Sequence, residues 1–173
     1  AVTWVILYLM VGLVQRDRAI DAGYEIASSR DHQPTRLEAK PSFGNILLWK
    51  IVYEQEDFFY VDAVRVGITP RIYEGTKTEK LDLEKHFPWL RIGSQQRKDI
   101  ERFHWFSNNY LGIDQKNKNK IIDIRYSMLP DEIDALWGIE LSPTAPLEEH
   151  VKWVTSREMN AKDIEKFWSM LFD

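Results

Sequence analysis

The chain has 173 residues and a formal net charge of −4, with 27 acidic and 23 basic side chains. This length suits one domain with a sizeable core, and the acidic balance argues against a nucleic-acid-binding surface, which needs an excess of Lys and Arg. Because the sequence contains no cysteine, disulfides, zinc–thiolate sites and thiol nucleophiles are excluded.

The first segment, Ala1 to Val14, carries no charge and is mostly apolar. As a helix it is about 21 Å long, which is shorter than the roughly 30 Å core of a bilayer. It also lacks the basic start of a signal peptide. We interpret it as the C-terminal part of a transmembrane helix, with a buried core helix as the alternative. By the positive-inside tendency, the basic residues that follow place the rest of the chain in the cytoplasm: Arg16, Arg18, Arg30 and Arg36.

Small and apolar residues continue at helical spacing beyond this segment. The sequence therefore predicts one long helix from about Val2 to Ser29, which ends before Pro34 because the residue preceding a proline resists helical angles. We assign residues 1–29 to this helix and residues 30–173 to a soluble α+β domain.

The clearest β pattern consists of two apolar runs, Ile46 to Tyr53 and Phe58 to Val66, on either side of a short acidic linker. Both runs are rich in β-branched and aromatic residues, which predicts a β-hairpin. The first run is apolar at odd and even positions alike, so it belongs in the middle of a sheet. We predict a short strand before the hairpin, Thr35 to Lys40, and an edge strand after it, Arg71 to Glu74.

The next part of the chain, residues 75–93, is polar, and we predict a surface excursion with at most one helical turn. Ser94 is the expected cap of a helix that runs to about Leu111 and stops at Gly112. The alternation from Ile121 to Met128 predicts a strand with one buried face.

The remaining predicted elements are an antiparallel partner strand, a last short strand and a final helix opened by Asn160 and Asp163. Strands joined by short turns, with helices around them, indicate the α+β class. We expect a curved antiparallel sheet with helices packed on one face, preceded by the long N-terminal helix. The two strands are predicted at Leu136 to Leu141 and Val151 to Thr155.

The histidines have none of the spacings that place two ligands on one face of a helix or strand. We therefore assign no metal ligand and no catalytic residue to this chain. The four histidines are His32, His86, His104 and His150.

Four charged residues on the predicted strands are candidates for a ligand site: Asp62, Arg65, Asp123 and Arg125. An isolated buried charge is very costly, so cross-strand ion pairs are the ordinary interpretation. The functional alternative is a polar cleft on the open sheet face, in which the two arginines receive an anionic group. The expected walls of this cleft are Trp49, Trp105 and Tyr126.

Several strings of the sequence resemble one family of bacterial inner-membrane proteins. These strings are Lys40-Pro-Ser-Phe-Gly-Asn-Ile-Leu-Leu-Trp-Lys50, Phe59-Tyr-Val-Asp-Ala-Val-Arg65, Arg102-Phe-His-Trp-Phe-Ser107, Asp123-Ile-Arg-Tyr126 and Leu136-Trp-Gly-Ile139. In this order they resemble the C-terminal half of the YdjM-like proteins, which are classed as membrane-bound metal-dependent hydrolases. The resemblance covers about Leu7 to Phe172.

The resemblance implies that the His and Asp metal ligands lie in a membrane-spanning N-terminal half, to which no residue here corresponds. It thus implies a divalent metal, such as zinc, for the full-length protein and no cofactor in this chain. The first functional hypothesis is a cytoplasm-facing, non-catalytic domain of an inner-membrane hydrolase, with a regulatory, substrate-presenting or assembly role.

A second hypothesis is a self-contained ligand-binding or enzymatic α+β domain with its cleft on the open sheet face. A pocket that converges on Asp62, Arg65, Asp123 and Arg125 would favour it, whereas plain salt bridges would favour the first hypothesis. A third possibility is a homo-oligomer formed through Ala1 to Val14.

Overall fold

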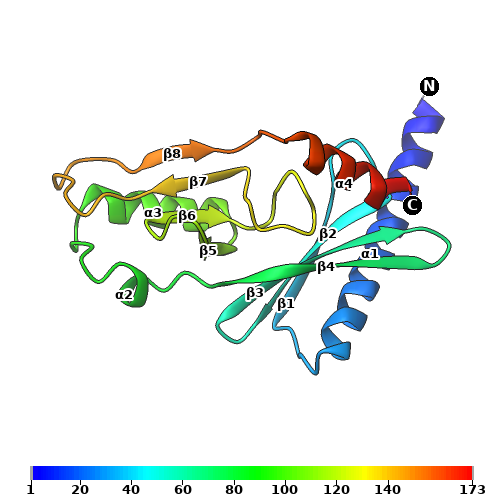
Figure 1. Ribbon diagram of the computed structural model, residues 1–173, viewed down its shortest axis with the longest axis horizontal. Helices are drawn as coiled ribbons and strands as arrows, with labels where there is room; N and C mark the ends of the chain where they lie inside the picture. Colours follow the sequence, from blue (N-terminus) through cyan, green and yellow to red (C-terminus); the bar gives the residue numbers. More distant parts are fainter. Residues whose placement is uncertain (1, 173) are drawn as a thin grey trace.

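Residues 2–172, which the computed structural model describes, fold into a long N-terminal helix, two four-stranded antiparallel sheets and three further helices (Figure 1). Sheet A has the strand order β1-β2-β3-β4, and sheet B has the order β5-β6-β7-β8. The helices are α1 (Val2–Ser29), α2 (Leu83–His86), α3 (Gln95–Phe106) and α4 (Ala161–Phe172). The strands are β1 (Arg36–Pro41), β2 (Leu48–Gln55), β3 (Phe58–Val66), β4 (Pro70–Glu79), β5 (Leu111–Ile113), β6 (Lys120–Asp123), β7 (Trp137–Glu140) and β8 (Lys152–Thr155).

The predicted hairpin is confirmed as β2 and β3, which pair in antiparallel register with Tyr53 opposite Tyr60. Strand β2 lies between β1 and β3, and its first six residues are buried. This central position agrees with the apolar run at both odd and even positions. Glu56 has a positive φ of 52° in the connecting turn.

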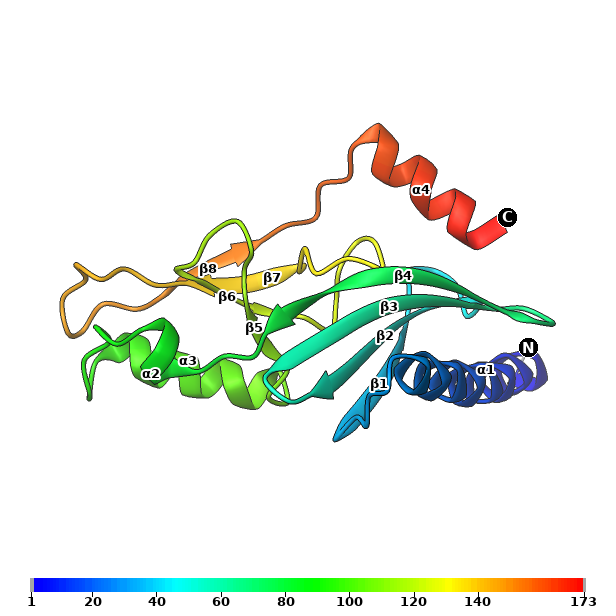
Figure 2. The same cartoon turned by 60° about the horizontal axis from the view of Figure 1, so that its bottom comes forward.

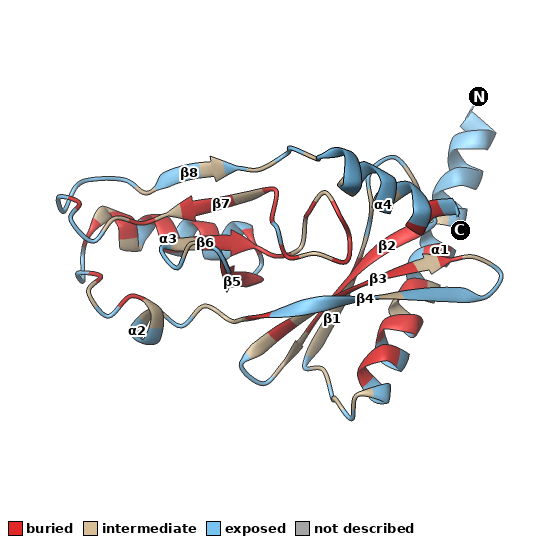
Figure 3. Cartoon of the chain, in the orientation of Figure 1, coloured by how far each residue is buried: buried red, intermediate tan, exposed pale blue. Residues whose placement is uncertain are grey.

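Helix α1 is also confirmed, and its C-terminal half packs on one face of sheet A. Ala19, Ala22 and Ala27 are buried there against β2 and β3. The close approach requires Gly23, because a Cβ at this position would lie 2.9 Å from the side chain of Ile51. The N-terminal half of the helix leaves the sheet and is exposed (Figure 3).

Helix α4 lies on the opposite face of sheet A from α1 (Figure 2). Met170 and Leu171 pack there against Leu48. The predicted opening of this helix is confirmed, since the Asn160 N–H donates to the Asp163 carboxylate at 2.9 Å and the Asp163 N–H donates back to Oδ1 of Asn160 at 3.1 Å.

Sheet B is covered by α3, which buries Ile100 and Phe103 against β5 and β6. The two sheets share a further cluster of buried residues, in which Val52 and Phe59 of sheet A meet Ile122 of sheet B. The sheets are therefore parts of one packed unit.

The α+β class, the antiparallel pairing and the preceding long helix agree with prediction, but the strands form two sheets. One cause is that β4 continues past Glu74 to Glu79, where the sequence suggested a surface excursion. Gly75 permits this, because a Cβ there would lie 2.2 Å from the carbonyl oxygen of Val61, beside a bulge in β3. A single bridge between Lys80 and Gly112 then joins the sheets.

The strand predicted from Ile121 to Met128 ends early, at Asp123. The Asp123 carboxylate accepts a hydrogen bond from the backbone N–H of Arg125 at 3.1 Å. This turn competes with the strand and reverses the chain.

The helix predicted to run to Leu111 ends at Phe106. Asn108 and Asn109 both adopt positive φ angles, 50° and 63°, which terminates the helix before Gly112. Gly112 instead belongs to β5, a strand that the sequence did not predict.

Candidate functional site

Asp62 is fully buried in β3 and is paired with Arg30, which follows α1 directly. The guanidinium donates two hydrogen bonds to the carboxylate, at 2.7 and 2.8 Å, and the Gly75 N–H donates a third at 3.0 Å. The hydrogen bonds that Arg30 donates to Asp62 raise the pKa of Arg30 above its ordinary value. This pair ties the end of α1 to the middle of sheet A.

Asp123 and Arg125 form a second salt bridge, 2.7 Å long, at the end of β6 in sheet B. The indole N–H of Trp137 also donates to the Asp123 carboxylate, at 3.2 Å. Tyr126 packs on this group, with its ring 5.2 Å from that of Trp137. These predicted site residues therefore lie together in a structural ion-pair cluster.

The other predicted residues lie elsewhere. Arg65 projects from the face of β3 opposite to that of Asp62. Trp49 is buried against α1, and Trp105 is exposed on α3. Three of the four charged residues, Asp62, Asp123 and Arg125, are thus engaged in plain salt bridges, the arrangement expected under the first hypothesis.

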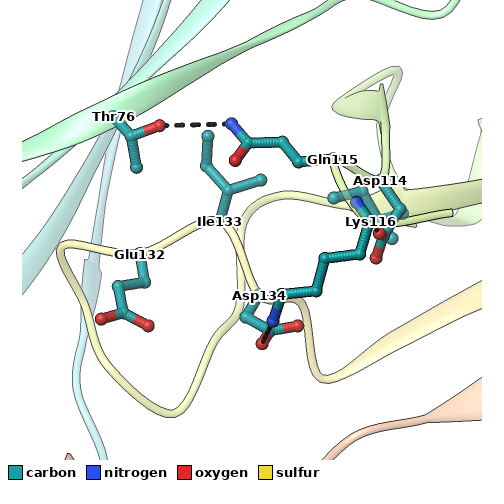
Figure 4. A pocket seen from close by; sticks show the side chains of 8 residues that line it. Thr76, Asp114, Gln115, Lys116, Glu132, Ile133 and Asp134 are labelled. Atoms are coloured by element: carbon teal, nitrogen blue, oxygen red, sulfur yellow. Dashed lines mark hydrogen bonds and ion pairs between the residues drawn. The ribbon is translucent and has the colours of Figure 1, made fainter. Parts of the chain in front are cut away.

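A polar cavity of about 280 Å³ lies between β4 and the loops that flank β6 (Figure 4). Its polar groups mostly bind one another: Gln115 donates to the Thr76 hydroxyl at 3.4 Å, and Lys116 pairs with Asp134 at 2.9 Å. Ligand sites are usually larger and mostly apolar. The lining residues, none of them predicted from the sequence, are Thr76, Asp114, Gln115, Lys116, Ile122, Glu132, Ile133 and Asp134.

Lys50 is a buried charged group that the sequence marked only as the single interruption of an apolar run. Its ammonium donates to the hydroxyl of Ser127, at 2.7 Å, and to the carbonyl of Glu132. Burial lowers the pKa of Lys50 to about 7, although the charges of Asp131, Asp123 and Glu132 oppose the shift. Ser127 is itself buried and donates to the Leu129 carbonyl, so the pair links the β6–β7 loop to sheet A.

This burial predicts a pH-dependent stability. Between pH 7 and about 10 the unfolded chain keeps the Lys50 proton and the folded chain does not, so stability rises with pH. We expect the free energy of unfolding to increase by roughly 2 kcal/mol between pH 7 and 9, measured by urea denaturation. Lys50→Met should remove this slope, whereas Lys98→Met, at an exposed position, should keep it. If the free energy of unfolding changed with pH equally in the wild type and in Lys50→Met, the lowered pKa of Lys50 would be contradicted.

The largest unpartnered feature is the N-terminal half of α1, residues 2–14. Eleven large apolar side chains in this segment are exposed, each by 43–75%. Contiguous exposed apolar surface of this extent marks a contact with a membrane or another protein. The eleven residues are Val2, Trp4, Val5, Ile6, Leu7, Tyr8, Leu9, Met10, Val11, Leu13 and Val14.

Packing against the domain begins immediately after this segment. The Gln15 side-chain amide donates to the Val66 carbonyl at 2.8 Å, and the Arg18 guanidinium binds the carbonyls of Gly67 and Ile68. The boundary between the free and the packed halves of α1 thus coincides with the first charged residues.

Within residues 2–172, no three His, Cys, Asp or Glu side chains are placed to hold a metal ion. His32 packs on Tyr60, with ring centroids 4.6 Å apart, and His150 bonds to the Asp99 carboxylate at 2.8 Å. Both histidines therefore contact other side chains of the domain.

The same part of the chain contains no helix that is both long and apolar enough to cross a membrane.

The free half of α1 is consequently the candidate functional site, because the Asp62–Arg30 and Asp123–Arg125 pairs are satisfied within the domain. This assignment of the site depends on the exposure and the contacts described above. Comparison with protein-family models, curated proteins and solved structures finds no match.

Proposed function

We propose that this chain is a membrane-attached, non-catalytic α+β domain. The free half of α1 inserts into a bilayer, and the two sheets lie in the aqueous phase at its surface. The domain belongs to an inner-membrane protein that resembles the YdjM-like proteins, which are classed as hydrolases. It faces the cytoplasm. Its role there is regulatory, substrate-presenting or in assembly.

The exposed apolar half of α1 is the observation that carries this proposal. Residues 2–14 form a rod about 20 Å long at 1.5 Å per residue. This length exceeds the depth of one leaflet, roughly 15 Å of hydrocarbon. Moving its eleven exposed side chains out of water contributes on the order of 10 kcal/mol.

The non-catalytic part of the proposal is supported by the state of the charged residues. Asp62 and Asp123 each accept hydrogen bonds from an arginine, and the carboxylates around the polar cavity bind lysines. These carboxylates are therefore occupied by ion pairs within the domain.

An environment-sensitive label tests the insertion directly. Because the chain has no cysteine, Leu9→Cys provides a unique attachment point for the fluorophore NBD. We expect the emission to rise and shift to shorter wavelength when phosphatidylcholine vesicles are added. The control is Ile92→Cys, an exposed apolar position on a loop before α3, which should show no change.

Two results would contradict the proposal. One is identical spectra for both labelled proteins with and without vesicles. The other is a blue shift at position 9 that depends on protein concentration and not on lipid, which would indicate self-association through α1.

A further inference from the structure

Two arginines face each other at the end of the β3–β4 hairpin. Arg65 and Arg71 are directly opposite in the antiparallel register of β3 and β4. Like charges in this position destabilise a sheet. Neither guanidinium has a carboxylate of residues 2–172 within 4 Å, and Nε of Arg65 is buried with no hydrogen-bond partner there. Among residues 2–172, the pair therefore has no carboxylate as a direct ion-pair partner.

Two more arginines lie at the same end of sheet A. Arg18 reaches the hairpin tip, where its guanidinium binds the carbonyls of Gly67 and Ile68. Arg16 is exposed two residues before Arg18, next to the free half of α1. We refer to Arg16, Arg18, Arg65 and Arg71 as the arginine collar. The two segments that provide it, residues 15–18 and 65–71, contain one acidic residue.

Exposed apolar side chains accompany the collar. Phe43 and Leu47 project from the β1–β2 loop, and Ile68 is fully exposed at the hairpin tip. The β1–β2 loop adjoins α1, since a Cβ on Gly12 would lie 3.9 Å from Ile46. Both views of the molecule place these two loops and the free half of α1 at the same end (Figures 1 and 2).

We propose that the arginine collar binds the phosphate groups of acidic phospholipids, while Phe43, Leu47 and Ile68 enter the headgroup layer beside it. This inference rests on the proposed function, because insertion of α1 brings the collar to the bilayer surface. Guanidinium groups match phosphate oxygens with paired hydrogen bonds, and basic residues flanking an inserted helix attract anionic lipid.

Charge also argues for lipid over a second copy of the chain. A symmetric dimer through this end would bring two arginine collars together, and like charges would repel. An acidic membrane supplies the opposite charge. The chain as a whole carries a net charge of −4, so an anionic surface repels the rest of the domain and favours contact through this end.

The test compares the double variant Arg65→Gln/Arg71→Gln with the control Lys98→Gln/Lys118→Gln. The control removes the same charge from exposed positions in α3 and the β5–β6 loop. Binding of the whole chain is measured by flotation with phosphatidylcholine vesicles and with vesicles that contain 30% phosphatidylglycerol. Each basic residue near an anionic surface contributes about fivefold, so we expect the collar variant to lose roughly thirtyfold on the acidic vesicles.

The outcomes separate this inference from the proposed function. A loss on acidic vesicles only, with unchanged binding to neutral ones and an undiminished melting temperature, supports the collar. Equal wild-type binding to both vesicles, or an equal loss in the control, overturns the collar and leaves the membrane-attached domain intact. Failure of the wild type to bind either vesicle overturns both.

Discussion

Replacing Leu9 and Leu13 by aspartate should abolish vesicle binding and leave the domain folded. Both side chains are exposed on the free half of α1 and make no part of the buried core. An aspartate at bilayer depth costs roughly 2.5 kcal/mol, which corresponds to about a sixtyfold loss of affinity for each substitution. Flotation of the double variant with neutral vesicles should therefore show no bound protein.

The matched control is Ile92→Asp/Trp105→Asp, which introduces two aspartates at exposed apolar positions away from α1. This variant should float like the wild type. Circular dichroism and urea denaturation should give the same curves for all three proteins. Retained binding by the Leu9 and Leu13 variant would refute the assignment of α1 as the lipid contact.

The second large effect is expected at the ion pair between α1 and sheet A. Arg30→Ala leaves the Asp62 carboxylate fully buried without its cation. Breaking one side of a buried pair usually costs 3–5 kcal/mol, and about 3 kcal/mol applies here because the Arg30 side chain is 28% exposed and water can replace it. The measurement is the midpoint of urea-induced unfolding, followed by tryptophan fluorescence.

Arg102→Ala is the control for this prediction. Its side chain is 74% exposed, and its nitrogen lies 3.6 Å from the Asp99 carboxylate. Exposed pairs contribute less than about 1 kcal/mol, so the unfolding midpoint should barely move. Similar losses in the two variants would show that the Asp62 pair is not buried as described.

The elements with strong local patterns were predictable from the sequence. Residues 46–66 read as a central hairpin because β-branched and aromatic residues fill both faces, and α1 follows from helical spacing without an internal proline. The caps at Ser94 and Asn160 are likewise local signals, and both side chains accept backbone hydrogen bonds as expected.

The pairings between distant residues were not predictable in this way. Asp62 invited an ion-pair prediction, but its partner Arg30 is 32 positions away and lies just beyond α1. Lys50 meets Ser127, 77 positions away, through the packing of two sheets that the sequence did not separate. Such contacts depend on tertiary arrangement, which periodicity does not encode.

The candidate site was likewise only partly predictable from the sequence. The apolar character of residues 1–14 was evident at once, whereas its exposure and the point where packing begins required the fold. Arg71 carried no sequence signal, because its significance comes from lying opposite Arg65 in the register of β3 and β4. The register counted outward from the β3–β4 turn places the two residues opposite each other, before the bulge between Val61 and Ala63 shifts it.

Helix α1 runs without interruption from Val2 to Ser29, about 42 Å at 1.5 Å per residue. No hinge separates the half in the proposed bilayer from the half that packs on sheet A. Because the helix is continuous, a change in its tilt in the bilayer rotates the entire domain through the same angle. Any conformational signal from the membrane would reach the two sheets as a change of orientation.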